Sequence, residues 1–119
     1  MNLNDIVDKL HLTPLTAPKD FSAITPTCGY ASDLLSCVMS GAVHHSVWIT
    51  LQAHINIIAV ASLLDLSAVI ITEGAKPDEA TLAKAAEESI NLLSTDEPTF
   101  AIVGKLWEMG LQCQAPNNN

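Results

Sequence analysis

A loop with three polar side chains joins two apolar runs, and it is the first place where this chain could bind a small molecule. Gln52 and His54 follow the run that ends at Thr50, and Asn56 lies near the start of the apolar stretch 55–64. A helix beginning here would present positive potential and main-chain amides, which favour an anion. We therefore expect this loop to contact an anionic ligand through Thr50 and the three polar side chains. The alternative is that Gln52 and His54 cap the helix and bind nothing.

The second candidate is the loop 72–77, which follows the next apolar run. Gly74 can adopt the left-handed backbone of a tight turn, and Lys76 can pair with a phosphate held by the first loop. Thr72 and Glu73 complete the predicted ligand contacts. The alternative is a plain strand-to-helix turn, in which the glycine satisfies the backbone and a proline opens the helix. That alternative leaves Glu73 and Lys76 unexplained.

Motifs of catalysis and metal binding are missing. The patterns GxxxxGK[ST] and GxGxxG are absent, and no serine lies in a GxSxG elbow. The adjacent His44 and His45 have no second ligand pair at metal-site spacing, and Cys28 and Cys37 form no CxxC pair. A third hypothesis, with His54 as general base, lacks a second group to orient the imidazole. We expect no catalytic residue, no metal ion and no cofactor.

Charge and hydropathy narrow the classes of partner. The net charge is −8, no arginine is present and the five lysines are scattered, which excludes nucleic-acid binding. No apolar run is long enough to span a membrane, and residues 1–10 lack the basic and apolar regions of a signal peptide. We therefore expect a cytoplasmic protein in which Cys28, Cys37 and Cys113 are reduced thiols in the core. Charged residues make up only 15%, which favours a homodimer that hides weakly polar surface.

The second half of the chain predicts a parallel sheet. Apolar runs recur about every 22 residues at 47–50, 68–72 and 90–94. Helical segments are predicted after them at 54–64, 78–89 and 96–109, the last with Phe100, Val103 and Trp107 on one stripe. Short strands without alternation, separated by helices, are typical of a three-layer α/β/α domain with a small, mainly parallel sheet. Right-handed crossovers would place the polar loops together at the carboxyl edge of that sheet.

The first half is less regular. The pattern predicts a helix over 3–10 and an extended segment near 12–15. Tyr30 then leads into a helix over about 32–39, with Ser32 as N-cap, Asp33 at the positive end of the dipole and Gly41 as the stop. We expect one domain, with residues 1–27 as a lead-in packed on the core, 28–111 as the α/β core and 112–119 as a frayed tail.

Three stretches together resemble the DRTGG domain family in its stand-alone form. They are Ser32–Met39, Val47–Thr50 with His54–Ser62, and Ser67–Pro77, and the resemblance runs from about residue 28 to residue 111. It departs from the family where Gln52-Ala53-His54 replaces Gly-Asp-Arg and where Thr72-Glu73-Gly74 replaces Thr-Gly-Gly.

The resemblance implies a fold similar to the N-terminal domain of HPr kinase/phosphorylase. It does not imply kinase activity, which belongs to a separate P-loop domain. Family members are fused to CBS-domain pyrophosphatases and phosphate acetyltransferases, where they support regulation and dimer formation. We therefore expect a non-catalytic regulatory domain that binds a small anionic metabolite or nucleotide at the strand C-terminal loops of a homodimer. The alternative is a docking module for a partner enzyme, such as an iron–sulfur hydrogenase or another metabolic enzyme, with no small ligand.

Overall fold

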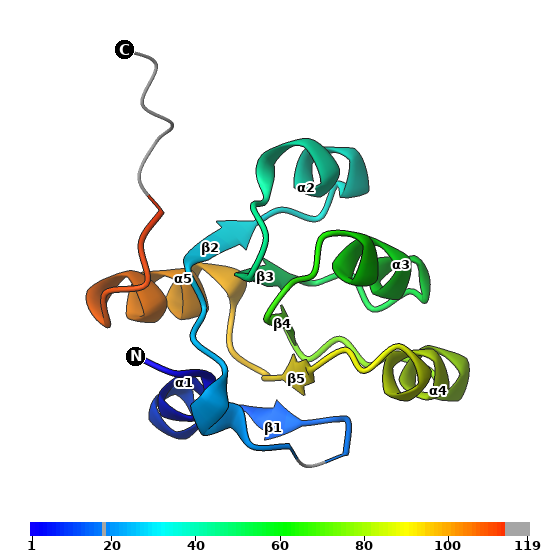
Figure 1. Ribbon diagram of the computed structural model, residues 1–119, viewed down its shortest axis with the longest axis horizontal. Coiled ribbons are helices and arrows are strands. Elements are labelled where there is room, and N and C mark those ends of the chain that lie inside the picture. Colours follow the sequence, from blue (N-terminus) through cyan, green and yellow to red (C-terminus); the bar gives the residue numbers. More distant parts are fainter. Residues whose placement is uncertain (18, 114–119) are drawn as a thin grey trace.

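A five-stranded sheet forms the centre of the computed structural model, which describes residues 1–17 and 19–113 (Figure 1). The strand order is β1-β5-β4-β3-β2. Strands β2 to β5 are parallel, and β1 runs antiparallel to β5. The strands are β1 (Thr13–Pro14), β2 (Cys28–Ala31), β3 (Ser46–Thr50), β4 (Ala68–Ile71) and β5 (Leu92–Ser94).

Helices cover both faces of this sheet and make three layers, as the sequence predicts. One face carries α1 (Leu3–Leu10), the short 3₁₀ helix η1 (Phe21–Ala23) and α5 (Thr99–Glu108). The other face carries α2 (Leu35–Gly41), α3 (Asn56–Leu63) and α4 (Glu79–Glu87). Two apolar cores therefore lie on opposite sides of the same strands.

The central strands are mostly apolar because both of their faces are buried, and their polar residues (Ser46, Thr50 and Ser94) stand at the strand ends. In β3, Val47 and Ile49 pack toward α1 and α5, whereas Trp48 packs toward the α2–α4 layer. Burying one such side chain contributes about 1.5–3 kcal/mol. The strongest sequence signal for a strand therefore comes from the middle of the sheet.

The predicted helices are present, with later starts in the second half of the chain. The helix over 3–10 is confirmed, and Asn2 and Asp5 form a capping box at its start. Helix α4 begins at Glu79 because Asp78 is its N-cap, and α5 begins at Thr99 because Pro98 precedes it in an extended conformation.

The prediction for residues 28–41 is wrong in two respects. Residues 28–31 form the parallel strand β2, and the helix that follows spans Leu35–Gly41 instead of 32–39. Ser32 is not its N-cap, because its main-chain carbonyl accepts the Trp48 indole N–H at 2.8 Å and its hydroxyl accepts Leu34 N. The Asp33 carboxylate likewise binds β3 rather than the helix. Contacts with β3 thus hold these two residues outside the helix.

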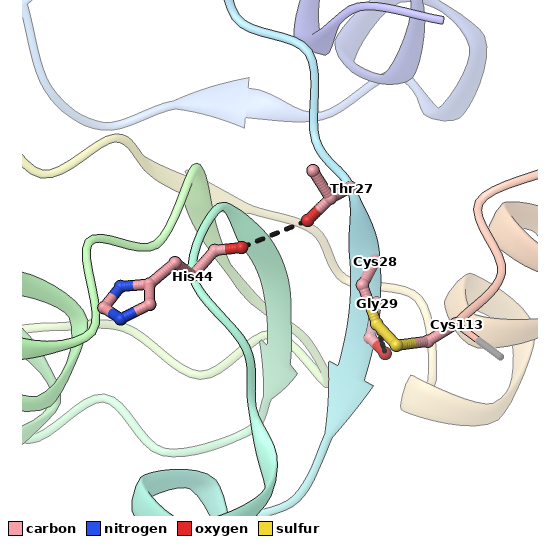
Figure 2. Close-up of a disulfide and its surroundings, with 5 residues drawn as sticks. All are labelled: Thr27, Cys28, Gly29, His44 and Cys113. Atoms are coloured by element: carbon pink, nitrogen blue, oxygen red, sulfur yellow. Dashed lines mark hydrogen bonds between the residues drawn. A yellow bond between two sulfur atoms is a disulfide. The ribbon is translucent and has the colours of Figure 1, made fainter. Parts of the chain in front are cut away.

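The prediction of three reduced thiols is also wrong. A disulfide joins Cys28 in β2 to Cys113, with Cα atoms 4.7 Å apart, and Figure 2 shows it beside the start of the strand. Cys28 is buried, Cys113 is exposed and Cys37 is a half-buried free thiol. The disulfide fastens the chain after α5 to an edge strand. The rest of the predicted frayed tail, residues 114–119, lies outside the described residues.

The start of β2 is also tied to the segment before β3. The Thr27 hydroxyl donates to the His44 carbonyl at 3.1 Å, as Figure 2 shows, and Thr27 N donates to the His45 carbonyl. Within the described residues, none of the helices combines the length and the apolar character that crossing a bilayer requires.

Candidate functional site

The carboxyl edge of the sheet brings the two predicted loops together. Thr72, directly after β4, donates its main-chain N–H to the Thr50 carbonyl at 2.9 Å. The Thr72 hydroxyl shares a hydrogen bond with the Thr99 hydroxyl at the start of α5. Thr50 and Thr72 are themselves fully buried, so they link the two loops and are not at the surface.

Glu73 and Gly74 connect the β4 loop to the next loop along the sheet. Both residues have left-handed backbones, with φ of 62° and 71°. Glu73 N donates to the Glu97 carbonyl at 2.9 Å, and Gly74 N donates to the Thr95 carbonyl at 3.1 Å. A Cβ atom on Gly74 would lie 3.2 Å from an Asp96 carboxylate oxygen, so glycine suits both the conformation and the space.

The Glu73 carboxylate occupies the N-terminus of α5. Its Oε2 accepts the Thr99 main-chain N–H at 2.8 Å. A helix N-terminus leaves such amides without partners inside the helix, and it is where an anion binds most readily. In this chain the anion at α5 is therefore one of its own side chains.

Asp33 has an equivalent role at the β3 loop, which the sequence did not indicate. Its Oδ1 accepts the Thr50 hydroxyl at 2.8 Å and Leu51 N at 2.9 Å. Gln52 Nε2 donates to the Asp33 main-chain carbonyl at 3.2 Å. The loop after β2 thus holds the predicted residues Thr50 and Gln52.

His54 is in the capping position that sequence reasoning left open. Its Nδ1 accepts Asn56 N at 3.1 Å. The next two amides of α3, Ile57 N and Ile58 N, donate to the carbonyls of His54 and Ile55. Main-chain donors at this helix start are therefore used locally, and His54 and Asn56 offer their exposed side chains instead.

Lys76 is a weakly held cation at this edge. Its Nζ lies 3.9 Å from Asp96 Oδ1, and the two side chains are 71% and 90% exposed. An exposed pair of this kind contributes about 0–1 kcal/mol, so Lys76 can exchange its partner for a ligand at little loss. Lys105, by contrast, contacts both oxygens of Glu97 at 2.7 and 2.9 Å.

A hollow of about 570 Å³ lies at the β5 end of the same edge. It is lined by Thr95, Asp96 and Glu97 of the β5 loop, by Lys105 of α5 and by His11 after α1, among others. Sequence reasoning missed it because its walls come from segments more than 80 residues apart along the chain. Within residues 1–17 and 19–113, no group of three His, Cys, Asp or Glu side chains could hold a metal ion.

No family model matches the sequence, and no curated protein matches it. Among solved structures, the chain is similar to the CBS and DRTGG domains of the regulatory region of Clostridium perfringens pyrophosphatase, complexed with its activator diadenosine tetraphosphate. The TM-score is 0.70 at 17% sequence identity, over 86% of this chain and 44% of that one. The chain thus has the α/β fold found in that regulatory region, and it spans less than half of the neighbour's length. The likeness supports a DRTGG-like fold, and membership of the family remains a prediction.

Proposed function

We propose that this chain is a non-catalytic regulatory domain of the DRTGG type that binds a nucleotide at the carboxyl edge of its sheet. The observation that carries the proposal is the shared fold with a regulatory region that was solved with a nucleotide activator. Ligands of open α/β sheets bind beyond the carboxyl ends of the strands, which is where the loops after β3 and β4 meet.

In this proposal the nucleotide lies across the predicted loops. Lys76 leaves Asp96 and contacts a phosphate, while Gln52, His54 and Asn56 contact the nucleoside from the neighbouring loop. The carboxylates of Asp33 and Glu73 stay in place as main-chain caps, because removing either leaves amide donors without partners. The ligand therefore meets lysine and neutral polar side chains rather than free helix amides.

The polar groups at this edge favour regulation over catalysis. Glu73 accepts Thr99 N, Asp33 accepts Thr50 Oγ1 and Leu51 N, and His54 Nδ1 accepts Asn56 N. The two carboxylates and the Nδ1 atom of His54 are thus committed to local structure, which leaves the rest of the exposed imidazole to contact a ligand. A catalytic histidine needs a second group that hydrogen-bonds to one ring nitrogen and orients the imidazole. In His54 the Nδ1 atom is already bound to Asn56 N, so it cannot bind such a group.

A thermal-shift screen against adenine and guanine nucleotides and dinucleoside polyphosphates tests the proposal. A ligand at 100 times its Kd adds about 2.7 kcal/mol of stability and raises the melting temperature by several degrees. Titration calorimetry of each hit then measures the Kd of variants.

Three variants locate the ligand. Lys76→Ala and His54→Ala should weaken binding at least tenfold, whereas Lys105→Ala, in the hollow beside β5, should leave the Kd unchanged. Loss of binding in Lys105→Ala alone would place the ligand in the β5 hollow and contradict the assignment to the β3 and β4 loops. A screen without any hit would favour the competing function, a docking module for a partner enzyme.

A further inference from the structure

A polar hollow of about 280 Å³ lies at the amino edge of the sheet, opposite the loops of the candidate functional site. It is lined by His45, Ser67 and Asn91, each of which directly precedes one of the neighbouring parallel strands β3, β4 and β5. Lys19 and Ile24 line it from the segment between β1 and β2. Ser67 and Asn91 are buried, whereas His45 and Lys19 are exposed. The hollow is therefore open to solvent and has buried polar groups in its wall.

Asn91 has a buried acceptor atom without a partner. The residue is 7% exposed, and its Nδ2 donates to the Ser67 carbonyl at 2.9 Å. That bond fixes the orientation of the amide, because turning it over would set two oxygens against each other. Oδ1 is then left without a hydrogen bond to any of the described residues. A buried oxygen of this kind costs free energy until a donor reaches it, so the hollow favours a ligand with a donor.

Two helix ends at this edge keep a side chain where glycine is the usual residue. Asp65 follows the end of α3 and Ser89 follows the end of α4, with left-handed backbones at φ of 51° and 58°. Glycine adopts that conformation without the penalty that a Cβ atom brings. Both residues line the hollow. The chain thus keeps a carboxylate and a hydroxyl there at a cost to its stability.

Lys19 and Asp65 give the hollow one ammonium group and one carboxylate. Lys19 Nζ donates to the Ser89 carbonyl at 2.8 Å, which uses one of its three donors. The Asp65 side chain is 74% exposed, and its Oδ2 lies 3.6 Å from His45 Nδ1. A metal ion would be repelled by the ammonium group, and a simple anion would be repelled by the carboxylate. A ligand that carries both charges can complement both residues.

We propose that this hollow binds a small zwitterion, namely a free α-amino acid. The ammonium group of the ligand donates to Asn91 Oδ1 and to Asp65, and its carboxylate accepts from the remaining donors of Lys19. Because Oδ1 is buried, a compact donor such as an ammonium group suits it. The volume fits a small ligand, since pockets for drug-sized molecules measure about 300–1,000 Å³. The hollow lies at the opposite edge from the proposed nucleotide site, so its occupancy does not depend on a nucleotide.

Titration calorimetry of the chain with each standard amino acid in turn tests the proposal. At least one amino acid should bind. Its N-acetyl derivative lacks the ammonium group and its methyl ester lacks the carboxylate, so each should bind about tenfold more weakly or worse. In NMR spectra the side-chain amide of Asn91 should shift when the amino acid is added, whereas the main-chain amide of Lys76 at the opposite edge should not.

A glycine substitution separates binding from stability. Asp65→Gly removes the carboxylate and relieves the left-handed backbone, so it should raise the melting temperature and still weaken binding about tenfold. The matched control is His11→Gly, at another left-handed residue (φ of 53°) outside the hollow, which should gain stability and keep the Kd. Lys19→Ala removes the other charge and should weaken binding by a similar factor.

A chain that binds none of the standard amino acids would overturn the proposal, and water alone would then satisfy Asn91 Oδ1. Equal affinity for the free amino acid and its blocked derivatives, or an unchanged Kd in Asp65→Gly, would overturn it as well. Nucleotide binding at the carboxyl edge should be the same in Asp65→Gly and wild type, so the two proposals can fail separately.

Discussion

The Glu73 carboxylate accepts the Thr99 main-chain N–H at 2.8 Å and so caps helix α5 from a loop 26 residues earlier in the chain. Glu73 does so from a left-handed backbone with φ of 62°, a conformation that disfavours side chains with a Cβ atom. The capping bond offsets that strain. The hydrogen bond therefore stabilises both the start of α5 and the shape of the β4 loop.

Substitutions at position 73 separate the cap from the strain. Glu73→Ala loses the cap and keeps the strained backbone, so we expect a loss of about 1–2 kcal/mol in the free energy of unfolding. Glu73→Gly loses the cap but relieves the backbone by about 1 kcal/mol, so it should stay close to wild type. Urea denaturation measures both, with Glu108→Ala, an exposed residue at the other end of α5, as control. Equal losses for alanine and glycine would contradict the strain argument.

The disulfide determines how many thiols of the native chain react with a reagent, and its reduction should destabilise the fold. The native chain should react with one equivalent of a thiol reagent, at Cys37, and the reduced, denatured chain with three. Cys28 and Cys113 are 85 residues apart, and closing a loop of that length contributes up to about 4 kcal/mol. Dithiothreitol should therefore lower the melting temperature by many degrees. The variant Cys37→Ser should show no native thiol and the same response to reduction, whereas three reactive thiols in the native state would refute the bond.

Replacing Gly41 or Gly104 by alanine should change the stability of the fold in opposite directions. A Cβ atom on Gly41, at the end of α2, would lie 2.7 Å from Cε1 of the Tyr30 ring, whose hydroxyl donates to the Cys37 carbonyl. Gly41→Ala should thus lower the free energy of unfolding by about 1–3 kcal/mol, as overpacking does. Gly104→Ala has open space in the middle of α5 and should raise it by about 0.5–1 kcal/mol. Chemical denaturation of the pair provides the comparison, and a stable Gly41→Ala protein would mean that Tyr30 moves freely.

The three inner parallel strands could be predicted from sequence because they are buried on both faces. In β3 and β4 every residue is buried, so the apolar runs stand out without any alternation. Strand β2 could not be recognised in this way, since Cys28–Ala31 has no apolar run of its own. Its extended form follows from pairing with β3, whose residues lie 18 positions further along the chain. The residues of β2 alone therefore do not indicate a strand.

The candidate site was predictable in its place but not in its internal contacts. Strand–loop–helix order was enough to bring Thr50, Thr72 and Gly74 to one edge. The bonds of Asp33 to the β3 loop and of Glu73 to α5 connect segments 17 to 26 residues apart. Such bonds depend on how neighbouring loops pack against one another. The secondary-structure propensity of each segment does not predict that packing. The pairing of Cys28 with Cys113 escaped prediction for the same reason.

Asp78 makes helix α4 sensitive to acid. Its Oδ1 accepts Thr81 N at 2.9 Å and the Thr81 hydroxyl at 2.8 Å. These two hydrogen bonds, the main-chain bond first, hold the pKa of the Asp78 carboxyl below its ordinary value of 3.8. A carboxyl whose pKa is lower in the folded state stabilises the fold fully above the pKa of the unfolded chain. That contribution is lost as the pH falls below 3.8 and through the folded pKa.

Asp78→Ala should therefore melt at a lower temperature than wild type at pH 7, and the gap should narrow as the pH falls below about 3.8. Asp78→Asn keeps an oxygen that can accept Thr81 N but does not titrate, so it serves as the matched control. Its melting temperature relative to Asp78→Ala should stay nearly constant with pH. Melting curves followed by far-UV circular dichroism between pH 2 and 7 measure all three. A wild-type advantage over Asp78→Ala that persists undiminished at pH 2 would show that the charged form of Asp78 adds nothing to the cap.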